Sequence, residues 1–418
     1  MGWKFERTPY PPLGIGYLAS VLKEKGWEVE VIDGQILTFK DYERKIREIK
    51  EGVVGISITI KQIKEAERIV KIIKNINPEI PIVVGGPGVV VIEMGLSSLK
   101  VDLIVKGEAE LEIDEIFKKA IEEKNKETQT PEIIRGQFPL DLNALPFPDR
   151  EILKTREYLN VWKRNTGMTS ISMISSRGCP FSCIFCDKYI SGRKFRARSP
   201  ANVVDEMEYL AEKYQPDDIF FYDDLFVYDR ERVIEICQEI KKRKLEVFWS
   251  AQARVDRIDE EMLKEMKRAG CKELYFGVES GSDRILKYLK KGFKRVQIIE
   301  AFNLCHQIGI RPGMYLIVGI PGETREDIEA TKSLIVECRP YLLNFSYLMP
   351  FPGTVLFKKT RQWIKSFDFS QWDEMNDSIY NFPFEIDPKK AHDEIYEVFK
   401  KMVEKGMECS SLQFCCEQ

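Results

Sequence analysis

Residues 169–186 read TSISMISSRGCPFSCIFC, a short apolar run that leads directly into a loop with three cysteines. The run at 171–176 is the first of six similar runs in the second half of the chain. The other five cover 218–224, 246–252, 273–280, 315–320 and 343–350. Segments of helical period separate them, so the pattern predicts a parallel sheet curved like a barrel. Six βα units instead of eight predict a partial (βα)6 TIM-like barrel.

The first 125 residues also alternate helical segments with short β-branched runs. The runs cover 27–34, 53–60, 80–88 and 101–110, and most of them end near a glycine. This pattern predicts a doubly wound, Rossmann-like parallel sheet. Because such sheets bind ligands beyond the carboxyl ends of their strands, six residues there are candidate binding residues: Ser57, Thr59, Gly85, Gly86, Gly107 and Glu108.

The remaining segments complete the predicted organisation. Residues 1–125 form the first domain, 126–168 a polar and proline-rich linker, and 169–370 the barrel. Residues 371–418 form a helical extension that ends in ECSSLQFCCEQ, with Cys409, Cys415 and Cys416. A solvated tail is the simpler interpretation of these thiols, and an arm that brings one of them to the barrel mouth is the alternative.

Composition excludes several classes of protein. The 418 residues include 64 Lys and Arg against 67 Asp and Glu, so the net charge of -3 gives no basic footprint for nucleic acid. No apolar run is long enough to span a membrane, and the first residues do not resemble a signal peptide. We therefore expect a cytoplasmic protein with no membrane span. In a reducing compartment the 10 cysteines are thiols, metal ligands or catalysts.

The cysteine loop directly follows the first barrel strand, at the face where barrel enzymes place their active sites. Gly178 and Pro180 allow a tight loop around three thiolates, Cys179, Cys183 and Cys186. Each thiolate could bind one iron of a 4Fe-4S cluster, which leaves the fourth iron open for a substrate. A zinc site is the alternative, but catalytic zinc usually takes an imidazole, and both histidines lie far away in the sequence.

The stretch CPFSCIFC resembles the signature of the radical S-adenosylmethionine (SAM) superfamily, with Phe185 as its aromatic residue. Further matching motifs lie at 220–225, 253–258, 276–282, 318–324 and 349–356. The resemblance implies that the open iron chelates the methionine moiety of SAM. It also implies that one electron, from a flavodoxin or ferredoxin type of donor, cleaves SAM to a 5'-deoxyadenosyl radical. That radical abstracts hydrogen from an unactivated carbon of a small-molecule or peptide substrate.

Five further residues are candidates for contacts with SAM or substrate, and each also has a structural interpretation. Asp223 and Asp224 could accept hydrogen bonds from the SAM ammonium group, or could form a cap or loop ion pair. Glu279 and Ser280 could bind ribose hydroxyls, or could pack at the barrel mouth. Arg254 could neutralise a carboxylate, or could form a structural ion pair.

Glycines and buried cysteines receive simpler interpretations. Gly319 permits close approach of the backbone to the adenine, although turn geometry alone would also favour glycine there. Four cysteines on predicted helices or helix ends are expected to be small core residues: Cys237, Cys271, Cys305 and Cys338.

The N-terminal segments, beginning with PPLGIGYLASVLKEKGWEVEVIDG, resemble the cobalamin-binding domain that precedes the barrel in one branch of this superfamily. A doubly wound domain with a different ligand, or with none, is the alternative. Two departures from the branch stand out. No D-x-H-x-x-G loop is present to supply a histidine to cobalt. The strand that usually precedes the PPLG segment is also missing. Either the start codon is assigned too late, which we favour, or the sheet lacks its central strand. We expect the chain as given to bind cobalamin weakly.

These observations together predict a cobalamin-dependent radical SAM enzyme that methylates an unactivated carbon. A non-methylating enzyme of the same architecture, which cyclises or rearranges its substrate, is the first alternative. A cluster-bearing or cobalamin-bearing sensor without turnover is the second. The mass of the product separates the two enzymes, and reductive cleavage of SAM excludes the sensor.

Overall fold

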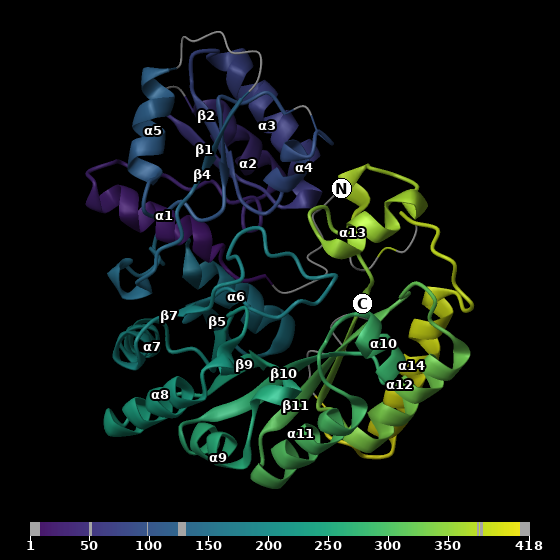
Figure 1. Ribbon diagram of the computed structural model, residues 1–418. Coiled ribbons are helices and arrows are strands. Elements are labelled where there is room, and N and C mark those ends of the chain that lie inside the picture. Colours follow the sequence, from purple (N-terminus) through teal and green to yellow (C-terminus); the bar gives the residue numbers. More distant parts are fainter. Residues whose placement is uncertain are drawn as a thin grey trace. The chain divides into compact units, whose positions relative to one another are not determined.

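The computed structural model describes residues 9–49, 52–97, 99–123, 131–373, 376 and 379–409, which separate into two compact units (Figure 1). The first unit holds the residues up to Tyr158 together with Asp187–Gly192 and Ser366–Asp373. The second unit holds the remaining residues. Two short segments from far along the chain therefore return to the first unit, which no signal in the composition indicates. No helix of the described residues is long and apolar enough to cross a membrane.

The first unit is built on a sheet of four parallel strands in the order β1-β2-β3-β4, which confirms the predicted parallel sheet. The strands are β1 (Val54–Ser57), β2 (Ile82–Gly85), β3 (Leu103–Lys106) and β4 (Glu132–Arg135). Residues 131–135, which the sequence places in the linker, form the edge strand β4 of this sheet.

Helices cover both faces of this sheet (Figure 1). The helices of the first unit are α1 (Leu13–Glu24), α2 (Phe39–Glu48), η1 (Ile60–Gln62), α3 (Ile63–Ile76), α4 (Val89–Glu93), α5 (Ile113–Glu122), η2 (Leu142–Ala144) and η6 (Phe369–Gln371). Leu22 of α1 and Ile116 of α5 are buried in one cluster with Val83, Leu103 and Val105 of the strands. Helix η6, from the segment beyond the barrel, lies against η1 and α3, where Lys64 forms an ion pair with Asp368 at 2.5 Å.

The strand predicted at 27–34 does not form. Residues 27–33 have no strand assignment, although Trp27 and Val29 pack against the core of the first unit. In a doubly wound sheet of order 2-1-3-4-5, the second strand pairs only with the first. The described residues contain no strand ahead of α1. Within the part of the chain that the structure describes, residues 27–33 therefore have no neighbouring strand with which to form a ladder.

The second unit is a half-barrel of six parallel strands in the order β12-β11-β10-β9-β8-β5. The strands are β5 (Ser170–Met173), β8 (Asp218–Phe221), β9 (Trp249–Ala253), β10 (Cys271–Glu279), β11 (Arg311–Val318) and β12 (Leu342–Tyr347). All six predicted strands are confirmed, and so is the incomplete barrel. A two-stranded antiparallel ribbon of β6 (Ser176–Arg177) and β7 (Arg196–Ala197), which was not predicted, flanks the cysteine loop.

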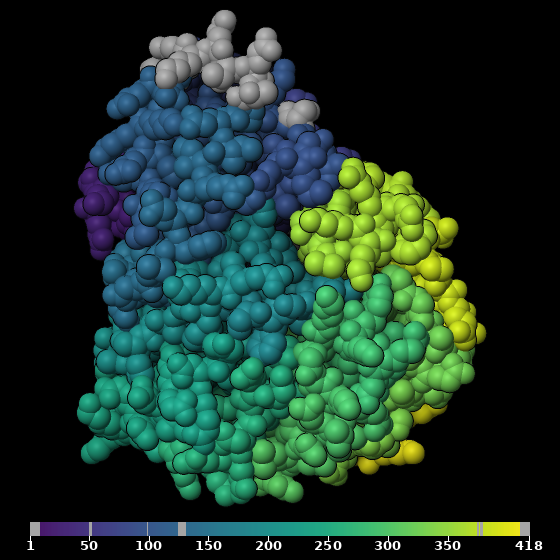
Figure 2. Space-filling model, viewed as in Figure 1, coloured from purple at the N-terminus to yellow at the C-terminus, as the bar shows by residue number. Residues whose placement is uncertain are grey.

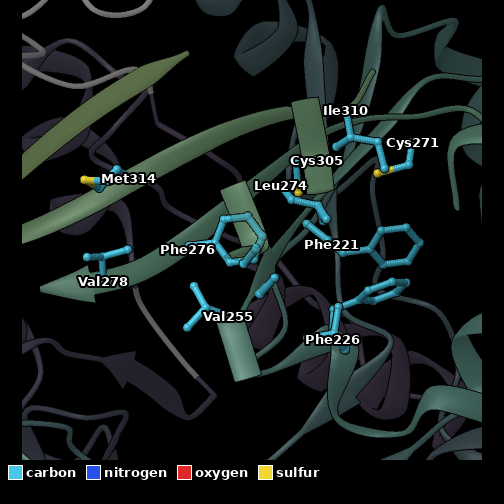
Figure 3. Packing of buried hydrophobic residues seen from close by; sticks show 14 of the residues in the cluster. Phe221, Phe226, Val255, Cys271, Leu274, Phe276, Val278, Cys305, Ile310 and Met314 are labelled. Atoms are coloured by element: carbon cyan, nitrogen blue, oxygen red, sulfur yellow. The ribbon is translucent and has the colours of Figure 1, made fainter. Parts of the chain in front are cut away.

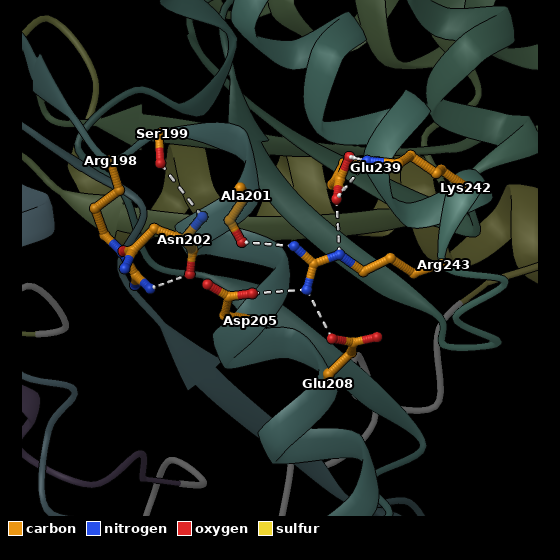
Figure 4. Close-up of polar contacts among 9 residues, drawn as sticks. All are labelled: Arg198, Ser199, Ala201, Asn202, Asp205, Glu208, Glu239, Lys242 and Arg243. Carbon is orange, nitrogen blue, oxygen red and sulfur yellow. Dashed lines mark hydrogen bonds and ion pairs between the residues drawn. The ribbon is translucent and has the colours of Figure 1, made fainter.

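The longer helices of the second unit pack against the outer face of the half-barrel. The helices of this unit are α6 (Thr155–Thr166), α7 (Pro200–Tyr214), η3 (Phe226–Tyr228), α8 (Arg230–Lys242), η4 (Val255–Arg257), α9 (Glu260–Arg268), α10 (Asp283–Tyr288), α11 (Arg295–Ile308), α12 (Arg325–Cys338), α13 (Val355–Thr360), η5 (Arg361–Trp363) and α14 (Pro388–Glu404). Arg243 joins α7 to α8, because its Nη1 donates to both Asp205 and Glu208 at 2.7 Å and its Nε donates to Glu239 at 2.8 Å (Figure 4).

The core of the second unit lies between the strands and these helices (Figure 3). Phe276 of β10 packs on Phe302 of α11 with ring centroids 5.4 Å apart. Cys271 and Cys305 are fully buried in the same cluster, as are Cys237 and Cys338. Burial raises the pKa of Cys305 to about 12, so this thiol stays neutral. The prediction that these four cysteines are core residues is confirmed.

The C-terminal extension contains helix α14, which lies against α12 and is yellow in Figure 2. The helix begins only at Pro388, where the Asp387 side chain accepts from the backbone N of Lys390 at 3.0 Å. Beyond the helix, Glu408 pairs with Arg311 at 2.5 Å, at the N-terminal end of β11. Cys409 therefore lies at the opposite end of the strands from the cysteine loop, and it is not a thiol at the barrel mouth. Cys415 and Cys416 lie outside the described residues.

Candidate functional site

The cysteine loop is anchored by its backbone. Gly178 adopts a positive φ of 83°, which glycine favours, and its N–H donates to Oδ2 of Asp224 at 2.6 Å. Ile184, between the second and third cysteines, is 1% exposed. Its N–H donates to the carbonyl of Leu289 at 3.1 Å, and its carbonyl accepts from the N–H of Leu356 at 2.8 Å. A buried isoleucine and a glycine turn thus hold the cysteines at the carboxyl ends of the strands.

The three thiols of this loop are available to a ligand. Cys179 and Cys183 are partly buried and Cys186 is exposed, unlike the fully buried core cysteines. Within the described part of the chain, no group of three or more His, Cys, Asp or Glu side chains is close enough to hold one metal ion. A 4Fe-4S cluster takes one thiolate per iron, so its three ligands do not meet at one ion. Three cysteines of one loop can therefore each bind a different iron of such a cluster.

Asp223 and Asp224 follow β8 and support the start of the loop. Asp223 is 1% exposed and accepts three hydrogen bonds: from the backbone N of Ser175 at 2.7 Å, from Ser175 Oγ at 2.6 Å and from Ser176 Oγ at 2.6 Å. Burial raises the pKa of Asp223, and these donors and the charge of Arg232 oppose the rise. Asp224 is exposed. The ammonium contact predicted from the sequence remains a prediction, and Asp224 is the more accessible of the two carboxylates.

Two cations that reach the loop are held by buried ion pairs. Arg254, just after β9, pairs with Asp256 at 2.9 Å, and its Nη1 lies 4.0 Å from Sγ of Cys183. Lys291 pairs with Glu279 at 2.8 Å, and its Nζ lies 5.7 Å from the ring centroid of Phe185. The sequence predicted Arg254, Glu279 and Phe185 and missed Lys291. Nothing in the run of basic residues after α10 marks one lysine as buried, so its ion pair is visible only in the structure.

Glu279 reaches Lys291 through an irregular strand end. Its φ of 70° lies in the left-handed region, which is uncommon for a residue with a side chain. The pairing of β10 with β11 shifts register between Gly277 and Glu279. A Cβ at position 277 would lie 2.7 Å from Oε1 of Glu279, so a larger residue there would push this carboxylate away from Lys291. The strained backbone therefore directs the Glu279 carboxylate to Lys291, as strained residues often do at functional sites.

Ser280 and Gly319 are held by structural contacts. The Ser280 hydroxyl lies 3.5 Å from Oγ1 of Thr331 on α12 and accepts from the backbone N of Ser282 at 3.2 Å. A Cβ at Gly319, whose φ is 78°, would lie 3.1 Å from Cγ of Pro388. Both predicted SAM contacts therefore remain predictions. The Gly319 N–H donates to Glu323 at 3.2 Å, and burial raises the pKa of this carboxyl to about 7.

The inner face of the half-barrel is aromatic and polar. The rings of Tyr275 and Tyr315 stack with centroids 5.8 Å apart, and Phe220 meets Tyr275 edge-on at 5.8 Å. Ser250 Oγ donates to Asp218 Oδ2 at 2.8 Å, and burial raises the pKa of this carboxyl to about 7. Since Asp218 begins β8, it lies at the end of the strands opposite the cysteine loop.

The candidate ligand residues of the first unit follow the strand ends as predicted. Ser57 and Gly85 end β1 and β2, Thr59 and Gly86 follow them, and Gly107 and Glu108 follow β3.

Glycines let the backbones of neighbouring loops touch at this edge. The N–H of Gly88 donates to the carbonyl of Ile58 at 2.8 Å, and a Cβ at Gly88 would lie 2.6 Å from the carbonyl oxygen of Thr59. A Cβ at Gly86, whose φ is 90°, would lie 2.7 Å from the same Ile58 oxygen. The loops after β1 and β2 are therefore closely packed on each other at the edge where a doubly wound sheet binds its ligand.

A further cluster at this edge was missed from the sequence. Tyr189, three residues after the last cluster cysteine, donates through its hydroxyl to Glu93 at 3.0 Å. Lys106, the last residue of β3, donates to the same carboxylate at 2.6 Å and lies 4.6 Å from the Tyr189 ring centroid. Segment 187–192 thus joins the carboxyl edge of the first sheet. No periodicity or motif predicts this contact.

Comparison with known proteins gives matches for both units. Residues 173–335 match the radical SAM superfamily, and residues 7–117 match the B12 binding domain. The chain is 33% identical over 370 residues to an uncharacterized methyltransferase of Pyrococcus horikoshii, which covers 84% of this chain and 78% of the relative. It is 28% identical over 389 residues to the anaerobic magnesium-protoporphyrin IX monomethyl ester cyclase of Rubrivivax gelatinosus, which covers 87% of this chain and 68% of that protein.

The fold is also similar to a solved structure. The radical S-adenosylmethionine methyltransferase TsrM from Kitasatospora setae, solved with cobalamin and a [4Fe-4S] cluster bound, superposes with a TM-score of 0.68 at 21% sequence identity. The match covers 85% of this chain and 77% of that one. At this identity the likeness is one of fold.

Proposed function

Because the chain belongs to the radical SAM superfamily and has an N-terminal B12-binding domain, we propose that it methylates an unactivated carbon of a small-molecule or peptide substrate. Membership of this family implies a 4Fe-4S cluster, SAM and cobalamin as cofactors. When bound, these groups supply one-electron cleavage of SAM to an adenosyl radical and a carrier for the methyl group. The observation that carries the proposal is the cysteine loop, anchored at the carboxyl ends of the half-barrel strands.

The residues of the chain then have distinct tasks. Cys179, Cys183 and Cys186 hold the cluster, one iron each. Asp223 accepts hydrogen bonds from Ser175 and Ser176, which lead into the loop, and Ile184 anchors the loop through two backbone hydrogen bonds. These contacts keep the three thiols in place before the cluster binds, so little reorganisation is required of the protein.

Two further tasks fall on the mouth of the half-barrel. Asp224 is exposed and could accept from the ammonium group of SAM. Lys291 places positive charge near the loop, where the carboxylate of SAM would need a partner. We propose that the substrate occupies the aromatic inner face near Tyr315, and that an external flavodoxin or ferredoxin type of protein supplies the electron.

The relatives favour methylation and leave a second candidate. The relative from Pyrococcus horikoshii is described as a methyltransferase, whereas the Rubrivivax gelatinosus relative is a cyclase. A cyclase would use the same cluster, SAM and half-barrel, and would remove hydrogen from its substrate without adding carbon. Product mass therefore separates the two candidates.

The test is anaerobic incubation of the reconstituted protein with SAM that carries a deuterated methyl group, a low-potential reductant, cobalamin and fractionated low-molecular-mass metabolites. A product that gains the labelled methyl group supports the proposal. A product that loses hydrogen and gains no label supports the cyclase. C183A should give neither product, whereas C409A, at the far end of the strands, should behave as wild type. The absence of both products and of 5'-deoxyadenosine in the wild type would refute both candidates.

A further inference from the structure

The Arg254 guanidinium is held on several sides. Its Nε and Nη2 donate to the Asp256 carboxylate at 2.9 and 3.1 Å, and Nη2 also donates to the carbonyl of Lys291 at 2.5 Å. Its Cζ lies 3.6 Å from the ring centroid of Phe181, which stacks on its face. The side chain is only 8% exposed. Because a guanidinium is planar, these contacts together fix the direction of the remaining nitrogen.

That remaining nitrogen, Nη1, lies 4.0 Å from Sγ of Cys183. Lys291, whose ammonium group also lies near the loop, is directed to Glu279 instead. A thiolate that binds iron carries negative charge, so an N–H donor from a cation makes a charge-assisted hydrogen bond to it. Hydrogen bonds to the cysteine sulfurs are among the factors that set the potential of an iron–sulfur cluster.

We propose that Arg254 is a positioning residue that donates to the Cys183 thiolate and raises the reduction potential of the cluster. The inference rests on the proposed cluster site. One-electron reduction adds negative charge to the cluster and its sulfurs, so the reduced form gains more from the guanidinium than the oxidised form does. Arg254 would thereby help a low-potential donor to reduce the cluster without touching SAM or substrate.

A structural role for Arg254 predicts a different outcome. If the guanidinium only joins Asp256, Phe181 and the Lys291 carbonyl, its loss alters stability and leaves the potential of a fully assembled cluster unchanged. Arg257 provides the matched control. It belongs to η4, the turn that directly follows Arg254, its guanidinium lies 5.1 Å from the Phe181 ring centroid, and its contacts are with aromatic rings. R254M and R257M remove the same charge from neighbouring positions, and only the first removes the donor to sulfur.

The experiment is a redox titration of the anaerobically reconstituted full-length protein, followed by electron paramagnetic resonance, with iron and sulfide measured in each sample. At the wild-type midpoint potential, we expect the ratio of reduced to oxidised cluster in R254M to fall about tenfold, equivalent to about 59 mV for one electron. We expect R257M to change this ratio less than twofold. R254K keeps the charge and loses the forked geometry, so its ratio should lie between those of the wild type and R254M.

The outcomes separate this inference from the proposed function. If R254M binds a full complement of iron and matches R257M, the inference is overturned and the cluster site stands. If R254M binds too little iron to titrate, the reduction potential of R254K tests the inference instead. A wild-type potential in R254K with a full complement of iron would overturn the assignment to the Nη1 donor. A wild-type protein that binds no iron would overturn the proposed function, and this inference with it.

Discussion

Replacement of Asp223 by asparagine should remove the support beneath the cysteine loop. The carboxylate accepts from one backbone N–H and two hydroxyls of Ser175 and Ser176, all within 2.7 Å. Asparagine has one acceptor oxygen, and its NH2 group would face at least one of these donors. An unsatisfied buried donor costs about 1–3 kcal/mol. Arg232, which is buried and donates to the carbonyls of Arg198 and Ser175, would also lose the attraction of the Asp223 charge.

Because asparagine leaves one or two of these buried donors without an acceptor, we take about 3 kcal/mol as the loss of stability in D223N. For a unit of this size, 1 kcal/mol shifts the midpoint by about 2–4 °C, so the transition of the second unit should fall by about 6–12 °C. Circular dichroism on the cluster-free protein measures the shift. Iron bound after reconstitution should fall as well, since Ser175 and Ser176 lead into the loop.

D224N is the matched control for D223N. Asp224 is exposed, and the contact that the structure gives its carboxylate is the N–H of Gly178 at 2.6 Å. Its replacement should cost less than about 1 kcal/mol, within the usual range for an exposed hydrogen bond. If D223N melts within about 2 °C of D224N and binds as much iron, Asp223 does not support the loop, and the reasoning from its three hydrogen bonds is wrong.

Three further substitutions test other parts of the account. Burial raises the pKa of Glu323 from 4.5 to about 7, so this carboxyl contributes about 3 kcal/mol of stability below pH 4.5, which is lost as the pH rises through 7. In E323Q the free energy of unfolding, measured by denaturation, should therefore depend less on pH over this window. E323Q should also be more stable than the wild type at pH 8. In G281A the free energy of unfolding, measured by thermal denaturation, should fall by about 1–3 kcal/mol, because the new Cβ would lie 2.5 Å from a carbonyl oxygen of α12. The control is G14A, whose Cβ would have no atom within 4 Å and whose stability should not fall. G88A should weaken cobalamin binding at least about tenfold in an absorbance titration, since the loops at the ligand edge must move apart; unchanged affinity would place the ligand elsewhere.

The strands of both sheets could be predicted because they are apolar and flanked by glycines. Buried runs such as 82–85 and 218–221 remain strands because each has partners in its sheet. The run at 27–34, WEVEVIDG, alternates apolar and acidic residues and forms no strand, because the described residues contain no neighbouring strand with which it could share hydrogen bonds. Residues 131–135 were taken for linker because they are polar, yet an edge strand can be polar on an exposed face.

The candidate site was predictable where a spacing carries the chemistry. The three cysteines follow from their spacing alone. The surroundings of the cysteines do not, because Lys291 reaches the loop through folding and belongs to no motif. The same holds for Tyr189 at the carboxyl edge of the first sheet. The structure also assigns Asp223 to the support of the loop, a role that a pair of carboxylates at a strand end does not distinguish from ligand binding.

The most direct test of the central claim is the detection of 5'-deoxyadenosine after anaerobic reconstitution with iron and sulfide, reduction with dithionite and addition of SAM. The account predicts the nucleoside from the wild type and none from C183A, with about four irons bound to the wild type. Bound iron without the nucleoside would favour a cluster-bearing sensor. A wild type that binds no iron would contradict the assignment of Cys179, Cys183 and Cys186 as cluster ligands.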